Sequence, residues 1–173
     1  FYGGSIANTL LSATGGKYVD FLDLIDVAVD GENANNIISG GTGFAPSAAI
    51  RTRVRGVTAL GPDAGVTATD ARATDQIFVY HNTTGASVDV SGSLIDGWRS
   101  GVYFNVSGDQ QKTRVYDNDF LNNGDGVRFV AAATQIGKFT GNAYIGNFAN
   151  ITNADRPYRS IDVPDTRENT YTA

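Results

Sequence analysis

Hydrophobic and polar residues alternate along short stretches of this chain, and the alternating stretches recur. In residues 113–129, Val115 lies in one alternating run, while Val127 and Phe129 lie in a second one. An Asp/Asn cluster, two apolar residues and an Asn-Asn-Gly-Asp-Gly turn separate the two runs. A period of two is typical of a strand with one buried face, and Asn-Gly and Asp-Gly pairs mark sharp corners. The pattern therefore predicts short strands joined by tight turns.

The pattern repeats along most of the chain. The first marker of the repeat is the inward-facing residue of one strand, found at Val29, Val54, Val90, Val115 and Phe139. Three of the four intervals are nearly equal, and the interval from Val54 to Val90 is longer. The second marker is the residue before the next strand, a glycine in four of five repeats, and it recurs with the same intervals, at Gly40, Gly65, Gly101, Gly126 and Asn150. We attribute the long interval to about eleven extra residues near 68–75, which form a polar loop.

A period of roughly 25 residues with no helical phase indicates stacked coils that share one core. We predict an all-β fold, a right-handed parallel β-helix of about five coils over residues 21–151. Residues 1–20 are expected to form an N-terminal cap, with a short helix over 5–12, or else an extended arm in another subunit's sheet. Residues 152–173 are expected to form a C-terminal tail with enough apolar residues for one docked strand. A β-sandwich is the rival architecture, and the constant spacing of the two markers counts against it.

The repeat also carries a family resemblance. The phrase NDFLNNGDGVRF, together with the repeat over about residues 22–151, resembles right-handed parallel β-helix proteins of the pectin-lyase-like superfamily. Such proteins include lyases, hydrolases and epimerases that act on acidic polysaccharides, and also passive shafts. The resemblance therefore implies a fold more specifically than an activity.

Composition and charge narrow the function classes. The chain has 41% hydrophobic and 18% charged residues, which indicates a folded body, and a net charge of −5, which disfavours nucleic-acid binding. No run of 18 apolar residues occurs, so we expect no membrane insertion. The chain has no cysteine and 21 glycines, and this composition leads us to expect an extracellular or cell-surface setting without thiolate metal sites or a cofactor.

The best carboxylate candidates for catalysis are Asp117 and Asp119. Two carboxylates at i and i+2 of a strand share a face, which suits acid/base chemistry. Asp and Asn also form corners and cap their own backbone, and Gly92 and Gly141 take the place of Asp117 in neighbouring copies. The single histidine, His81, follows a short apolar run and is expected to be a surface or capping residue. The corner interpretation is therefore favoured, and the chain is expected not to be an enzyme.

Basic and aromatic residues suggest a glycan-binding surface. The side chains of Arg51, Arg53 and Arg55 alternate with inward residues, so all three should point outward from one strand. The full set of candidate glycan contacts is Arg51, Arg53, Arg55, Trp98, Arg99, Tyr103, Arg114 and Arg128. Arg114 is the expected counterpart of Arg53 two repeats later. The arginines alternatively pair with aspartates, and Trp98 alternatively plugs the core.

The function expected from the sequence is a non-enzymatic structural protein. A stack of coils has open sheet ends, and an open edge is a template for another chain. We therefore expect assembly through the ends, with copies of the chain or with a larger surface protein. The alternatives are a glycan-binding module, or a lyase, hydrolase or epimerase acting on acidic polysaccharide.

Overall fold

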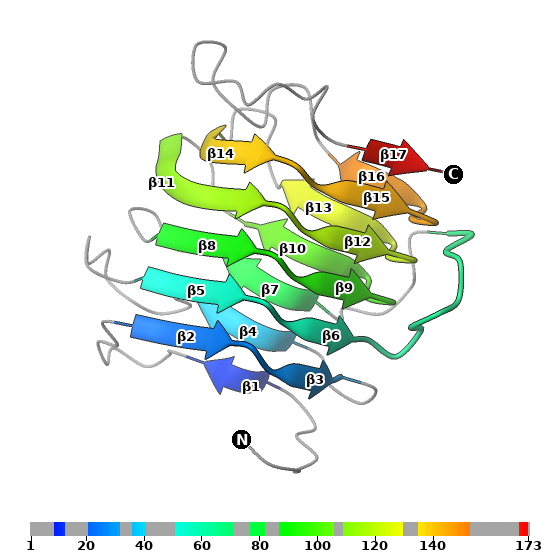
Figure 1. The fold of residues 1–173 in the computed structure, drawn as a ribbon, viewed down its shortest axis with the longest axis horizontal. Coiled ribbons are helices and arrows are strands. Elements are labelled where there is room, and N and C mark those ends of the chain that lie inside the picture. Colours follow the sequence, from blue (N-terminus) through cyan, green and yellow to red (C-terminus); the bar gives the residue numbers. More distant parts are fainter. Residues whose placement is uncertain are drawn as a thin grey trace.

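Strands are the regular elements of the described part of the chain (Figure 1). The computed structural model describes residues 9–12, 21–31, 36–40, 51–70, 77–81, 87–105, 109–129, 135–152 and 170–172. Sheet A contains β1 (Thr9–Ser12), β4 (Asn36–Gly40), β7 (Ile77–His81), β10 (Ser100–Phe104), β13 (Asp125–Phe129) and β16 (Ala149–Thr152). Sheet B contains β2 (Phe21–Ile25), β5 (Arg51–Arg55), β8 (Ser87–Ser91), β11 (Asp109–Tyr116) and β14 (Gln135–Thr140). Sheet C contains β3 (Ala28–Asp30), β6 (Thr58–Leu60), β9 (Leu94–Asp96), β12 (Asp119–Leu121), β15 (Ala143–Ile145) and β17 (Thr170–Thr172).

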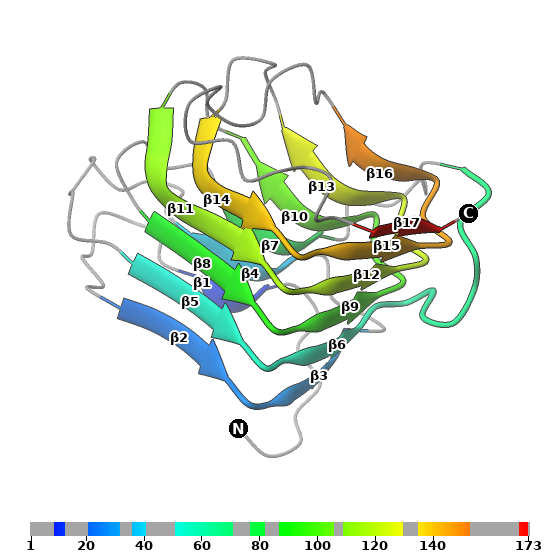
Figure 2. The ribbon, with the colours of Figure 1, turned by 45° about the horizontal axis from the view of Figure 1, so that its top comes forward.

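The chain passes through sheets B, C and A in that order, and it does so five times from β2 to β16. We call one such passage a repeat. Neighbouring strands of each sheet come from successive repeats and pair in parallel, so that the repeats lie one above another (Figure 2). The predicted all-β fold with parallel, repeated strands is confirmed.

The register confirms most of the first marker and corrects its beginning. Val54, Val90, Val115 and Phe139 occupy the same position on successive strands of sheet B. Leu24, however, pairs with Val54, whereas Val29 lies in sheet C opposite Ala59. The first interval therefore begins at Leu24 and is longer than the sequence suggested, because alternating positions on sheets B and C of one repeat look alike in sequence.

The second marker is correct only in its later part. Ser100 pairs with Asp125, and Asp125 pairs with Ala149, so Gly101, Gly126 and Asn150 are equivalent. Gly40 pairs with His81 instead, and Gly65 lies outside any strand. The extra residues lie between β6 and β7, in residues 61–76, and therefore begin before the predicted loop at 68–75.

The corner between sheets B and C requires a left-handed backbone in every repeat. The residues at this corner have φ between 50° and 66°, and they are Asp26, Gly56, Gly92, Asp117 and Gly141. Where the residue is aspartate, the next repeat has glycine, because a Cβ on Gly56 would lie 2.2 Å from Asp26 Oδ1 and one on Gly141 2.1 Å from Asp117 Oδ1. The corner interpretation of Asp117 is confirmed.

Buried asparagines connect the corners of successive repeats. Asn118, only 1% exposed, accepts a bond from the Ser93 backbone N–H (3.1 Å) and donates through Nδ2 to the Val90 carbonyl (3.0 Å). Asn142 does the same one repeat later, toward the Asn118 N–H and the Val115 carbonyl. These side chains thus bond a corner N–H that lies outside the strands and a carbonyl of the strand before that corner.

A second asparagine ladder lies at the corner between sheets C and A. Asn123 Oδ1 accepts from the Trp98 N–H at 2.9 Å, and Asn123 Nδ2 donates to the Ile95 carbonyl. Asn147 repeats the arrangement with the Asn123 N–H and the Phe120 carbonyl. The two ladders join the third, fourth and fifth repeats at these two corners.

Apolar side chains stack between the sheets in the same register. The rings of Phe104 and Phe129 lie 5.2 Å apart, as do those of Phe120 and Tyr144. His81, at the position equivalent to Phe104, is fully buried and meets that ring edge-on. It is therefore a core residue, and the expected surface or capping role of this histidine was wrong.

The two terminal segments are described in part. Thr9–Ser12 is strand β1, paired with β4 of the same chain, so the predicted helix is wrong for these residues. Residues 1–8 and 13–20 lie outside the described part, as do residues 153–169 of the tail. The expected docked strand of the tail is present as β17, in which Tyr171 pairs with Tyr144.

We predict that Asn118→Ala lowers the free energy of unfolding by about 1–3 kcal/mol, because it leaves the buried Ser93 N–H without its partner and removes a bond to the Val90 carbonyl. Asn105→Ala is the matched control, because the half-buried Asn105 side chain bonds only the Tyr80 and Tyr103 hydroxyls in the described part. Denaturant unfolding measures both variants. Equal losses in the two variants would show that the ladder does not support the stack.

Candidate functional site

The outer face of sheet B presents the predicted arginine row. In β5 the arginines at 51, 53 and 55 are partly exposed, whereas Thr52 and Val54 are buried. This follows from the alternation of side chains along a strand whose inner face packs on the core. The prediction that the three guanidinium groups share the outer face is confirmed.

Charged residues from successive repeats line up with Arg53. The register places Asp23, Arg53, Asp89, Arg114 and Lys138 in one column across sheet B. Arg114 is therefore the counterpart of Arg53 two repeats later, as predicted. Asp23, Asp89 and Lys138 were missed, because their relation to Arg53 follows from the pairing of strands that are far apart in sequence.

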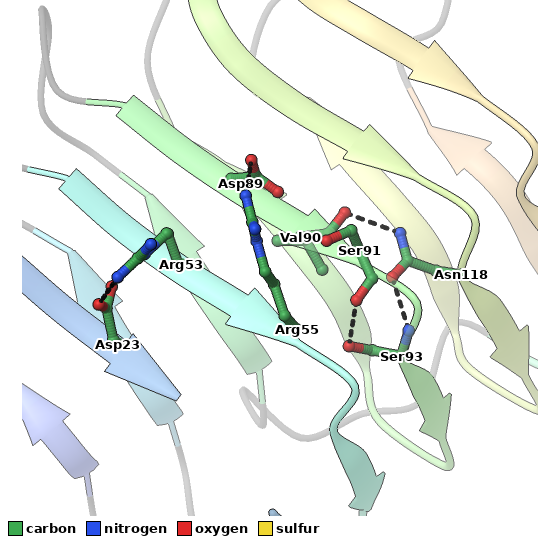
Figure 3. Close-up of polar contacts among 8 residues, drawn as sticks. All are labelled: Asp23, Arg53, Arg55, Asp89, Val90, Ser91, Ser93 and Asn118. Carbon is green, nitrogen blue, oxygen red and sulfur yellow. Dashed lines mark hydrogen bonds and ion pairs between the residues drawn. The ribbon is translucent and has the colours of Figure 1, made fainter. Parts of the chain in front are cut away.

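Two of the arginines are held by aspartates (Figure 3). Arg53 binds the Asp23 carboxylate through both Nε (2.9 Å) and Nη2, and Arg55 Nη2 donates to Asp89 Oδ2 at 2.9 Å. The aspartate-pairing interpretation therefore holds for Arg53 and Arg55. Neither guanidinium is a free cation.

The Arg53 ion pair changes the acidity of its partner. The hydrogen bonds from Arg53 lower the pKa of Asp23 below its ordinary value of 3.8, with smaller effects from the charges of Arg53, Arg51 and Arg55. Desolvation acts in the opposite direction and is outweighed. The bond to Asp23 likewise raises the pKa of Arg53.

The upper part of the column is more open to ligands. Arg114 is exposed, and it lies next to Lys138 with no acidic residue between them in the register. The Lys138 ammonium lies 3.8 Å from the centroid of the Tyr116 ring, a cation–π contact that leaves its charge in place. These two adjacent cations are the strongest candidate for an anion-binding site on sheet B.

Charge is unevenly distributed among the three sheets. The strands of sheet B contain six basic and three acidic residues, a formal charge of +3. The strands of sheet C contain three aspartates and no basic residue, a formal charge of −3. The strand sequences of sheet B are thus basic in a chain whose net charge is −5.

The other predicted glycan contacts lie elsewhere. Tyr103 and Arg128 are neighbours on the outer face of sheet A, with the guanidinium 4.9 Å from the ring centroid. Tyr80, which sequence reasoning missed, lies below Tyr103, with the two ring centroids 5.5 Å apart and the rings tilted by 45°. Arg99 lies in the connection between β9 and β10. The sequence therefore combined residues of two different sheets into one surface.

Trp98 belongs to the core, and the prediction that it stacks on a sugar ring was wrong. Its side chain is fully buried, its Nε1 donates to the Ala59 carbonyl at 3.2 Å, and its ring lies 5.7 Å from that of Phe78. A Cβ on Gly31 would lie 1.9 Å from the indole, so glycine provides the space that Trp98 fills. The alternative interpretation, a plug, is correct.

The candidate catalytic pair does not share a strand face. Asp117 has a φ of 55° at the corner between β11 and β12, and Asp119 begins β12 on the outer face of sheet C. The strand is interrupted between them by the buried Asn118, so the i, i+2 argument does not apply. In the described part of the chain, no three His, Asp or Glu side chains gather as a metal site would require.

Comparisons of this chain with known protein families, with curated proteins and with solved structures found no match. Within the described ranges, no helix has the length and apolar character needed to cross a membrane.

Asp23→Asn should lower the melting temperature at pH 7, because it removes a bond that the ionised carboxylate makes to Arg53. The folded-state pKa is the lower one, so the stabilisation is present above pH 3.8 and is lost as the pH falls through the lowered pKa. Melting curves of the two proteins should therefore converge in acid. Arg53→Gln should lower the melting temperature similarly, and the double variant should add little. Strictly additive effects would contradict the pairing.

Proposed function

We propose that this chain is a non-enzymatic structural protein of the cell surface or extracellular space that assembles through its two ends. In this proposal the three sheets wind as a right-handed parallel β-helix of the pectin-lyase-like kind. Support for the winding comes from the constant order of sheets B, C and A through five repeats. The extracellular setting is supported by composition, since the chain is acidic, free of cysteine and rich in glycine.

The observation that carries the assembly proposal is the presence of sheet edges at both ends. Among the described strands, β1, β2 and β3 have a partner on one side only, and so have β14, β16 and β17 at the opposite end. A strand with one partner presents unpaired backbone groups that another chain can use. Leu24 and Val29, in the first repeat, keep 8% and 7% of their surface exposed, whereas their counterparts Val54 and Ala59 keep none.

The native mass and shape of the full chain test this proposal. We expect rods of variable length in negative-stain images, and a scattering mass that rises with concentration, because an end-to-end contact between unlike ends propagates. Removing residues 1–20, which include β1, should abolish the rods while the circular dichroism of the strands persists. A species of 18.2 kDa at every concentration would refute assembly.

A second candidate function is binding of an acidic polysaccharide by the outer face of sheet B. The formal charge of +3 on the sheet B strands of an acidic chain favours it, as do the adjacent cations Arg114 and Lys138. Uronate or sulfate groups are the ligands that such a row would hold. This binding is compatible with assembly, because it uses a side of the stack and not its ends.

The double variant Arg114→Ala/Lys138→Ala should elute from an immobilised acidic polysaccharide at lower salt than the native chain, because it removes both neighbouring cations. The matched control is Arg99→Ala/Arg128→Ala, which removes the same charge away from sheet B. Equal losses in the two variants would point to net charge alone, and no retention of the native chain would remove this candidate.

A further inference from the structure

The two ends of the stack are stepped, and the steps differ. We call the strands at one level of the stack a layer, so a complete layer has one strand in each sheet. In the described part, sheets A and C have six strands each and sheet B has five. The additional strand of sheet A is β1, beyond β4 at the N-terminal end, and that of sheet C is β17, beyond β15 at the other end (Figure 1).

These steps allow one head-to-tail offset. If a second copy were displaced by five layers, its β3 would overlap β17 of the first copy, and its β1 would overlap β16. At a displacement of six layers both overlaps disappear, because β17 and the β1 of the second copy then lie in the same layer, in different sheets. The described strands of the two ends therefore fit together when each end supplies one strand of a shared layer.

We propose that copies of this chain stack head to tail with this six-layer offset. In sheet A, β16 pairs with β1 of the next copy, and in sheet C, β17 pairs with β3 of the next copy. The inference rests on the proposed assembly through the ends, and it adds the partner, the polarity and the strands that meet. Among the described strands, none fills the position in sheet B between β14 and β2 of the next copy.

The strand directions agree with this arrangement. Every described pair of neighbouring strands is parallel, so a copy added in the same orientation continues all three sheets. On either side of β3, the Val27 carbonyl accepts from the Thr58 N–H of β6, and the Gly31 N–H donates to the Leu60 carbonyl of β6. Because successive residues of a strand face opposite neighbours, the backbone groups of Ala28 face the free edge. These groups would pair with β17 of another copy.

The charges of the two ends are complementary. The strands and corner at the N-terminal end, β2, β3 and the turn between them, carry Asp26 and Asp30, together with Asp23, which is paired with Arg53, and no described basic residue. The end strands β14, β16 and β17 carry Lys138 and no acidic residue. Among the described residues, this distribution favours contact between unlike ends over contact between two N-terminal ends.

The offset predicts a repeat distance. Neighbouring strands lie about 4.8 Å apart, so six layers give an axial rise of about 29 Å per copy, whereas five layers would give about 24 Å. The distance is measured directly by helical reconstruction or diffraction of the native assemblies. The shorter, five-layer rise, or side-by-side association, would overturn the six-layer offset while leaving assembly in place.

The edge contact is tested by Ala28→Pro in the full chain. Proline removes the N–H that faces the free edge and spares the bonds between β3 and β6. Ala28→Ser is the matched control, because the Ala28 side chain is exposed and serine keeps the N–H. We expect the proline variant to need at least about tenfold more protein for half-maximal assembly, at an unchanged circular dichroism spectrum, and the serine variant to behave as the native chain.

The outcomes separate the two claims. Proline and serine variants that assemble equally well would overturn the pairing of β17 with β3. A native chain that never assembles would overturn the proposed function, and this inference with it. If the proline variant does not fold, the axial rise of the native assemblies decides the offset by itself.

Discussion

Hydrogen bonds from buried asparagine side chains to the corners of the neighbouring repeat hold the last three of the five repeats in register. A chain that turns sharply between two sheets directs backbone N–H and C=O groups into a region that water does not reach. Asn118 and Asn123 supply both an acceptor and a donor there, each for the repeat below. An unpaired buried group costs about 1–3 kcal/mol, so displacement of one repeat relative to the next is strongly disfavoured.

A fixed register determines which side chains become neighbours on the surface. Once Val54 lies below Val90, Arg53 must lie below Asp89, and the columns of sheet B follow. The left-handed corner likewise determines which residue the next repeat can have. An aspartate at the corner occupies the space above it, so the next repeat must have glycine there. Core, corners and charged columns are thus consequences of a single stacking rule.

Much of the fold could be predicted because alternation and turn residues are local signals. The residues Val54, Val90, Val115 and Phe139 were placed correctly on equivalent strands. Val29 was placed on the wrong strand, because strands of sheets B and C have the same alternation of apolar and polar residues. A connection of different length in the first repeat also changes the spacing between equivalent residues. The strand at Thr9–Ser12 could not be recognised, since pairing with β4 decides its conformation.

For the candidate site, the sequence could predict only which side chains of a single strand share a face. Alternation placed Arg51, Arg53 and Arg55 on one face, but their aspartate partners depend on pairing between repeats. Trp98 is buried because Gly31 and Gly61 of earlier repeats leave room for its ring, and nothing near Trp98 in sequence indicates that space. Contacts across repeats are visible only in three dimensions.

Hydrogen exchange at the corner amides tests the stacking rule most directly. The backbone N–H groups of Ser93, Trp98, Asn118 and Asn123 bond to side chains of the next repeat and lie outside the strands. If the asparagine ladders hold the stack, these four amides exchange as slowly as those in the middle of sheet B, because they open only when repeats separate. Exchange at the rate of ordinary turn amides would contradict the account.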